Sequence, residues 1–321
     1  MEMRPFDQTD LKDVKQAFST RRVQTSEAAM LITGQYQPSH GDVVLAEISR
    51  LGQHTGIQLP GGRRATAYVG DRVVLAFGAR YAPDQFESRL PEDLSDCDLA
   101  AGGGLASRVV AAHGSMKKPT QLKIHGVLAR SNGTPLNLSD FAVPLPITRR
   151  RIPVIAVFGT SMNSGKTVTA ASLVHGLSRS GLRVGAAKIT GTGACGDFNA
   201  MQDAGACQVC DFTDAGYPST FGASNDEVTG ISERLINYLT IQGCQVAVVE
   251  IADGVYQRET AALAAHVHAR TRYNGIVFAA GDASGAIAGA TVLQGHGLHL
   301  LGLSGLVSAS PLAAREAMLQ T

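Results

Sequence analysis

Residues 154–177 read VIAVFGTSMNSGKTVTAASLVHGL and decide the fold of the C-terminal half. Five apolar residues, Val154–Phe158, come first, and a run of glycine and small polar residues follows. After Thr167 the apolar residues recur three and four positions apart, which indicates a helix up to Arg179, with Gly181 as its stop signal. The order of strand, glycine-rich loop and helix predicts a phosphate-binding loop, because consecutive backbone N–H groups and the helix N-terminus attract anions.

The loop itself, Gly159–Thr167, carries the residue types that nucleotide phosphates require. A glycine at position 165 lets the backbone approach the phosphates, Lys166 reaches the β- and γ-phosphates, and the Thr167 hydroxyl binds Mg²⁺. The usual spacing has four residues between the glycines, whereas this loop has five, with Thr160 in the place of the first glycine. We expect ATP and Mg²⁺ as cofactors. The predicted nucleotide-binding residues are Gly159, Thr160, Asn163, Ser164, Gly165, Lys166, Thr167 and Val168.

The residues after Pro144–Pro153 alternate between apolar strands and helical segments. Predicted strands are Val154–Phe158, Val184–Ile189, Val209–Phe212, Val246–Ile251, Ile276–Ala280 and Leu298–Leu303. Such alternation implies right-handed crossovers and a mainly parallel sheet, whose ligands bind beyond the carboxyl ends of the strands. The predicted fold class of residues 154–321 is therefore α/β, a P-loop nucleotide-binding domain.

The first 143 residues have a different pattern, with short strands and closely spaced turns. Asn132-Gly133 is a hairpin signal, and the short strands predict a β-rich domain, either a small barrel or a sandwich. Helices are expected at Thr9–Phe18 and at Leu105–His113, the second one entered through Gly102–Gly104. That glycine run forms either a plain turn or a second anion site. Residues 144–153, with three prolines and a basic run, are the predicted linker.

The residues from Val154 to about Met318 resemble dethiobiotin synthetase. The loop GTSMNSGKT shares that enzyme's extra residue and its opening Gly-Thr. The likeness continues without a gap through TVTAASLVHGLSRSGLRVGAAKITGTG, which corresponds to that family's first helix, second strand and lysine loop. The resemblance implies that Lys188, 22 residues after Lys166, binds substrate and phosphate, and that Thr192 contacts the substrate.

Two acidic residues match metal-binding positions of the same family. Asp203, in QDAGA, corresponds to an aspartate that helps to bind Mg²⁺, and Glu250, in VVEIADG, corresponds to a metal-binding glutamate. A carboxylate at the end of an apolar strand also needs a cation nearby, since burying an unpaired charge is costly. The predicted metal ligands are therefore Thr167, Asp203 and Glu250, and the predicted catalytic residues are Lys166, Lys188 and Glu250.

The chain departs from dethiobiotin synthetase in several respects. Leu306 stands near the asparagine with which that family reads adenine, so the choice between ATP and GTP stays open. Glu250 is followed by Ile-Ala-Asp-Gly instead of Gly-Ala-Gly-Gly, which indicates a different substrate. The first half of the chain has no counterpart in that family.

Two weaker resemblances keep other functions open. An unrelated N-terminal domain combined with GT-x₅-GKT and CDFTDAG is similar to D-glutamate N-acetyltransferase-like proteins. That likeness implies acyl transfer, with a phosphate of coenzyme A in the loop. The molybdopterin-guanine dinucleotide adaptor shares the same superfamily, and this likeness implies a non-catalytic protein that binds GTP or ATP.

Further polar residues near the predicted carboxyl edge complete the candidates. Arg258 is expected to bind an acidic substrate, and Asp253 to assist or replace Glu250. With Thr192, these two residues form the predicted substrate set. Three other aspartates stand near the same edge, namely Asp197, Asp211 and Asp214. Either one of them orients the substrate or all three are exposed loop acids, and we expect the second.

The composition is that of a globular protein, with 44% hydrophobic and 17% charged residues. A net charge of +1 argues against nucleic-acid or membrane-surface partners. The N-terminus MEMRPFDQTD lacks the apolar segment of a signal peptide, so we expect a cytoplasmic protein. The five cysteines argue against a complete disulfide framework, and for the C-x-x-C of Cys207 and Cys210 we expect buried thiols without a metal or redox role.

These observations predict a two-domain α/β enzyme, a ligase or kinase for a small molecule. The C-terminal domain is expected to bind ATP and Mg²⁺ and to activate an anionic substrate, a carboxylate or carbamate, by phosphoryl transfer. The N-terminal domain is expected to supply part of the substrate pocket or an oligomer interface, with a homodimer favoured. Acyl-coenzyme A binding without ATP hydrolysis, or partner-dependent GTP binding, would instead favour the transferase or the adaptor.

Overall fold

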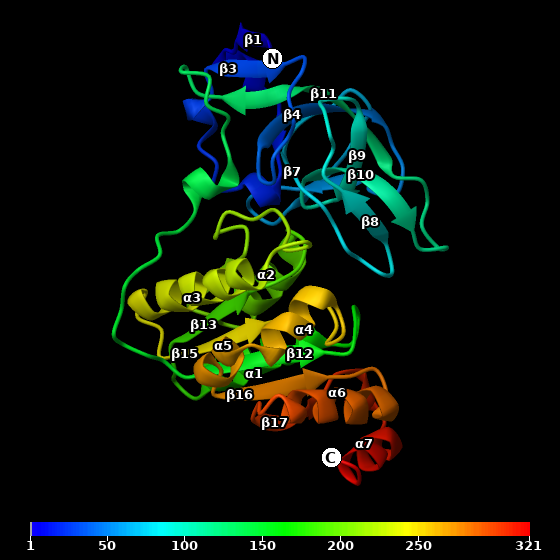
Figure 1. The fold of residues 1–321 in the computed structure, drawn as a ribbon, viewed down its shortest axis with the longest axis vertical. Helices are drawn as coiled ribbons and strands as arrows, with labels where there is room; N and C mark the ends of the chain where they lie inside the picture. The colour runs from blue at the N-terminus through cyan, green and yellow to red at the C-terminus, as the bar shows by residue number, and fades with distance from the viewer. Residues whose placement is uncertain (1) are drawn as a thin grey trace. The chain divides into compact units, whose positions relative to one another are not determined.

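The computed structural model describes residues 2–321, and the chain divides into two compact units (Figure 1). Unit 1 comprises Met1–Val143, Thr192–Gly196 and Phe212–Phe221, and unit 2 comprises Pro144–Gly191, Asp197–Asp211 and Gly222–Thr321. Two short segments of the C-terminal half thus belong to unit 1, although no local signal in the sequence indicates it. Residues 144–153 contain no regular helix or strand and belong to unit 2.

Unit 1 is built from strands and short 3-10 turns. The strands are β1 (Glu2–Pro5), β2 (Lys15–Gln16), β3 (Met30–Thr33), β4 (Val43–Arg50), β5 (Gly56–Gln58), β6 (Arg64–Thr66), β7 (Arg72–Phe77), β8 (Phe86–Arg89), β9 (Cys97–Ala101), β10 (Leu105–Ala112) and β11 (Thr120–Ala129). The 3-10 turns are η1 (Gln8–Leu11), η2 (Phe18–Thr20), η3 (Thr25–Glu27) and η4 (Leu138–Phe141).

Strand pairing in unit 1 closes a ring. β4 pairs with β7, β7 with β10, β10 with β9, β9 with β11, and β11 again with β4. All these ladders are antiparallel except β7–β10, which is parallel. A sheet that returns to its first strand leaves no open edge within the ring, so these strands form a small barrel.

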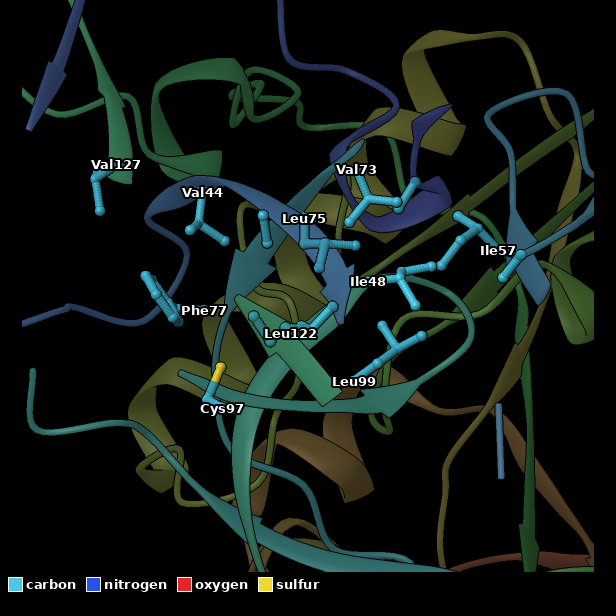
Figure 2. Packing of buried hydrophobic residues seen from close by; sticks show 14 of the residues in the cluster. Val44, Ile48, Ile57, Val73, Leu75, Phe77, Cys97, Leu99, Leu122 and Val127 are labelled. Atoms are coloured by element: carbon cyan, nitrogen blue, oxygen red, sulfur yellow. The ribbon is translucent and has the colours of Figure 1, made fainter. Parts of the chain in front are cut away.

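The barrel strands fill two cores with alternate residues. Val44 and Ile48 of β4 lie in one buried cluster with Leu75 of β7 (Figure 2). Leu45 of β4 and Val74 of β7 lie in a second cluster, which also takes residues from η4 and the N-terminal segment. Because successive side chains of a strand point to opposite faces, the same strand packs inside the ring and outside it.

The two helices expected in the first half are absent from the described residues. Leu105–His113 was expected to be helical, but Leu105–Ala112 is strand β10, paired on both sides. The glycines before it form the turn from β9, where Gly104 has a φ of +108°. Over Thr9–Phe18 the chain forms η1 and then β2, which pairs with β7. Pairing with neighbouring strands has overridden the local helical pattern.

Unit 2 alternates strands and helices. The strands are β12 (Val154–Gly159), β13 (Val184–Lys188), β14 (Gln208–Asp211), β15 (Val246–Glu250), β16 (Gly275–Ala279) and β17 (Leu300–Ser304). The helices are α1 (Lys166–Arg179), α2 (Cys195–Asp203), α3 (Asn225–Ile241), α4 (Arg258–Ala265), α5 (Val267–Arg272), α6 (Ala283–Gly295) and α7 (Pro311–Met318), with the 3-10 turn η5 (Leu306–Ala309). Within the described residues, no helix combines the length and hydropathy that crossing a bilayer requires.

The sheet of unit 2 has the order β14-β13-β15-β12-β16-β17, and all its ladders are parallel. The predicted strands and the parallel sheet of the C-terminal half are therefore confirmed, with strand ends shifted by no more than two residues. Val184 and Ala186 of β13 pack in one cluster with α1, whereas Gly185 faces Leu239 of α3. Helices thus cover both faces, as a parallel sheet requires.

Candidate phosphate-binding site

The loop between β12 and α1 has a backbone shape that needs glycine at two positions. Gly159 ends β12, and a Cβ there would lie 2.6 Å from Ser164 Oγ and 2.7 Å from Lys166 Cγ. Gly165, immediately before α1, has a φ of +99°, a conformation that favours glycine. Asn163 also has a positive φ, of +59°. These turns bring the loop around to the N-terminus of α1, where unpaired backbone N–H groups attract anions.

Lys166 is the first residue of α1 and is almost fully buried. Its Nζ donates a hydrogen bond of 2.6 Å to the carbonyl oxygen of Ser161, so the side chain lies along the loop. Burial lowers the pKa of Lys166, and the nearby carboxylates of Glu250 and Asp253 oppose that effect. The ammonium group is therefore held against the backbone of the loop.

Thr167 connects α1 to two carboxylates. Its hydroxyl oxygen lies 2.7 Å from Asp197 Oδ1, to which it donates a hydrogen bond, and 3.5 Å from Glu250 Oε1. Asp197 is in the first turn of α2, and Glu250 is the last residue of β15. Elements far apart in the sequence thus bring three oxygen-bearing side chains together.

Lys188 is the last residue of β13, directly beside Glu250 in the parallel ladder. Its Nζ forms an ion pair with Asp197 and lies 3.8 Å from Glu250 Oε1. Burial opposes the charge on Lys188, but the attraction of Asp197 and Glu250 outweighs burial and raises the pKa. The lysine is therefore charged at neutral pH.

Glu250 is 1% exposed, and its Oε2 has no hydrogen-bond partner among the described residues. Burial and the neighbouring Asp197 raise the pKa of Glu250 to about 7, while Lys188 and Lys166 oppose the rise. Burial likewise disfavours the charged form of Asp197, but Lys188 outweighs it and lowers the pKa. A buried carboxylate oxygen without a partner is costly and fits a site that takes a cation.

All these side chains border one cavity of about 380 Å³. The lining residues are Met162, Asn163, Gly165, Lys166, Thr167, Val168, Lys188, Asp197, Glu250, Ala252, Asp253 and Leu306. Two lysines and three acids give the cavity a formal charge of 2 − 3 = −1 when all are ionised. The cavity lies at the carboxyl ends of β12, β13 and β15, where parallel sheets bind ligands. Together, the loop, helix and sheet form a phosphate-binding fold of the P-loop type.

No family model matches the chain, and no curated protein matches it either. Similar solved structures include the signal recognition particle receptor FtsY from Elizabethkingia anophelis, with 15% identity, 50% of this chain and 51% of that chain covered, and a TM-score of 0.35. The kinase domain of Escherichia coli tyrosine kinase ETK matches with 10% identity, 50% and 69% coverage, and a TM-score of 0.37. The signal recognition particle 54 kDa protein from Aeropyrum pernix matches with 17% identity, 52% and 45% coverage, and a TM-score of 0.31.

This chain spans about half the length of the FtsY structure. The strand order of unit 2 and the geometry of its loop are by themselves those of a P-loop fold.

The structure brings most of the predicted residues to the cavity. Among the lining residues are the predicted Asn163, Gly165, Lys166, Thr167, Val168, Lys188, Glu250 and Asp253. Gly159, Thr160 and Ser164 shape the loop without lining the cavity.

Other predicted residues lie elsewhere. Asp203 is exposed at the C-terminal end of α2, and Arg258 is exposed at the start of α4; neither lines the cavity. Thr192 belongs to unit 1, where it forms a β-bridge with Ser219.

Asp197 is the functional candidate that the sequence did not single out. It was grouped with Asp211 and Asp214 as an exposed loop acid, but those two are buried and Asp197 is half-buried in the cavity wall. The expectation of three exposed acids was therefore wrong. The available signal was its place in the first helical turn, nine residues after Lys188.

Proposed function

We propose that this protein is an enzyme that uses ATP and Mg²⁺ to activate a small anionic substrate by phosphoryl transfer. One observation carries the proposal: Lys166, Thr167, Lys188, Asp197 and Glu250 border a single cavity at the mouth of the phosphate-binding loop. Phosphoryl transfer requires little covalent chemistry from the protein. Positioning and charge neutralisation dominate, and this cavity offers both.

The two lysines are proposed to neutralise the negative charge of two different groups, the nucleotide phosphates and the co-substrate. Lys166 lies along the loop and supports binding of the nucleotide phosphates. Lys188 lies on the neighbouring strand end, where Asp197 and Glu250 hold it. Its proposed role is to hold an anionic co-substrate. A compact ammonium group in a buried site gains importance as negative charge moves in the transition state.

The oxygen donors of the cavity fit Mg²⁺. The Thr167 hydroxyl and the carboxylates of Asp197 and Glu250 are the hard ligands that this ion prefers, and Glu250 Oε2 is buried without a partner. Among residues 2–321, no three His, Cys, Asp or Glu side chains gather into a complete metal site. Such a shortfall is normal for Mg²⁺, which takes its remaining ligands from phosphate and water. When bound, the ion neutralises phosphate oxygens.

The lining of the cavity indicates the chemical class of the base and of the substrate, but not their identity. Leu306 and Val168 line the cavity with largely exposed apolar side chains, suited to contact with the face of a base and unable to read its edge. The negative formal charge of the cavity favours an anionic substrate only together with a cation. A ligase or kinase acting on a carboxylate or carbamate satisfies these conditions.

A thermal-shift panel tests the proposal. ATP with Mg²⁺ should raise the Tm of the wild type, and Lys166→Ala should lose that rise while keeping the Tm of the unliganded protein. Phosphate release should depend on added small carboxylates. A rise with acetyl-coenzyme A that survives EDTA, without ATP hydrolysis, would overturn the proposal in favour of acyl transfer. The homodimer and the cytoplasmic location expected from the sequence remain predictions, which sedimentation and cell fractionation test.

A further inference from the structure

Cys207 has a different sulfur neighbour from the one that its C-x-x-C motif suggests. Cys210 is buried within β14, and its Sγ lies 3.8 Å from the carbonyl oxygen of Ala186. Cys207 precedes β14, is exposed, and has its Sγ 3.5 Å from the Sγ of Cys244. The expectation that Cys207 is a buried thiol was therefore wrong.

The sheet topology explains why these two sulfurs meet. Cys207 and Cys244 precede β14 and β15, which flank β13 on either side. A Cβ on Gly185 of β13 would lie 2.8 Å from Cys244 Sγ, so a glycine in the middle strand leaves room for the sulfur. The backbone N–H of Cys207 donates to Val184 O at 2.8 Å, which fixes the chain beside β13.

We propose that Cys207 and Cys244 form a redox modification site, in which a disulfide-type oxidant such as glutathione disulfide converts the two thiols into a disulfide. A sulfur–sulfur bond needs a separation of about 2.05 Å. The sulfurs therefore must approach by roughly 1.5 Å. Because β13 lies between the two strands, this approach requires the chain before β14 to shift toward Cys244.

The order of the two chemical steps follows from access. The thiolate of exposed Cys207 attacks one sulfur of glutathione disulfide and expels a glutathione thiolate, which leaves a mixed disulfide. Cys244 then attacks Cys207 Sγ and expels the second glutathione thiolate. The two thiol protons end on the two released glutathione molecules, and the oxidant takes both electrons. Burial and the hydrogen bond with Cys207 raise the pKa of the Cys244 thiol to about 12, so this second step is the slow one.

The disulfide would lie at the end of the sheet opposite the phosphate-binding cavity. Both cysteines precede the amino ends of their strands, whereas Lys188 and Glu250 stand at the carboxyl ends. The bond would close a loop between positions separated by 37 residues. We therefore expect oxidation to raise thermal stability, by about 5–10 °C in Tm, through restriction of the unfolded chain. The Tm increment produced by ATP with Mg²⁺ should stay the same.

Peptide mapping without reduction tests the site. After incubation of the folded protein with glutathione disulfide, the Cys207 and Cys244 peptides should be covalently linked, and dithiothreitol should release them. Cys210→Ser should give the same linked peptides, because Cys210 takes no part. Cys244→Ser should stop at the mixed disulfide on Cys207, and its Tm should not rise.

Two results would overturn the inference. One is a wild-type protein that retains glutathione on Cys207 with Cys244 still titratable after prolonged incubation. The other is a linked peptide that contains Cys210 in place of Cys244. A failure of ATP binding in the thermal-shift panel would leave this test unaffected, so the two proposals can fail separately.

Discussion

Lys188 is held by two carboxylates, and its charge is therefore in place before any ligand arrives. We predict that Lys188→Ala lowers turnover by about 10²–10³-fold, comparable to the loss of one preorganised donor. The affinity for ATP, measured by calorimetry, should change little, because the proposed function assigns nucleotide binding to Lys166 and the loop backbone. Lys188→Arg should restore little of the turnover, since the planar guanidinium group of arginine does not replace a compact ammonium group in a tight site.

Two opposite results would remove Lys188 from the proposed role. If Lys188→Ala abolishes ATP binding, the residue belongs to the nucleotide site alone. If turnover stays at the wild-type rate, the ammonium group is a structural partner of Asp197 and Glu250.

Asp197 and Asp203 lie on the same short helix and give a matched pair of variants. Asp197 bonds to Thr167 and lines the cavity, whereas Asp203 is exposed. We predict that Asp197→Asn raises the Mg²⁺ concentration needed for the ATP-dependent Tm increment by about tenfold or more. Asp203→Asn should leave it unchanged. Equal Mg²⁺ dependence in both variants would exclude Asp197 from the metal site.

At the scale of elements, two helical glycines differ in what surrounds them. A Cβ on Gly289 of α6 would lie 2.0 Å from Phe278 Cζ, a buried ring atom of β16, whereas a Cβ on Gly176 of α1 meets nothing within 4 Å. We predict that Gly176→Ala stabilises the protein by about 0.5–1 kcal/mol through the better helix propensity of alanine. Gly289→Ala should destabilise it by about 1–3 kcal/mol, since overpacking exceeds that gain.

Urea unfolding of the two variants measures both effects. A gain in stability in Gly289→Ala would show that α6 does not pack on β16 at this distance. The packing of α6 on β16 also supports the site, because β16 pairs with β12, the strand that leads into the phosphate-binding loop.

At the scale of the whole molecule, each unit contains a histidine whose neutral form is favoured. Burial and the positive charge of Arg80 lower the pKa of His54 to about 4, and burial and the charge of Arg272 do the same for His268. The unfolded chain binds these protons near pH 6.5, so the folded state loses stability as the pH falls from about 6.5 toward 4. For each histidine, the free energy of unfolding is higher above pH 6.5 than below pH 4 by on the order of 3 kcal/mol.

The pH dependence of Tm checks this expectation. The lowered pKa favours the neutral form of the His54 imidazole at pH 5 in the folded state, and its Nε2 lies 3.0 Å from Ala100 O. His54→Gln keeps a polar partner for that carbonyl and removes the titration. The fall in Tm between pH 7 and pH 4.5 should therefore be smaller in this variant than in the wild type. Parallel curves for the two proteins would contradict the lowered pKa.

The sequence by itself determined the phosphate-binding loop and the parallel sheet of unit 2. Glycine, lysine and threonine at Gly165–Thr167 act through their own backbone and their immediate neighbours, so their roles can be predicted from a contiguous stretch. The six strands of unit 2 could likewise be predicted from their own residues, because each is a short apolar run between turn signals. Lys188 and Glu250 followed from the resemblance to dethiobiotin synthetase, and their place at strand ends agrees with the rule that parallel strands end at one edge of the sheet.

Only the tertiary structure decided which acids, thiols and segments meet. Asp197 and Asp203 are six positions apart on α2, and the docking of the helix beside β13 determines that Asp197 contacts Thr167. Strand β10 replaced an expected helix because it pairs with β9, the strand just before it, and with β7 and β8. Cys207 meets Cys244 because β14 and β15 both lie next to β13 in the sheet. Such contacts depend on long-range strand order, and local periodicity carries no information about it.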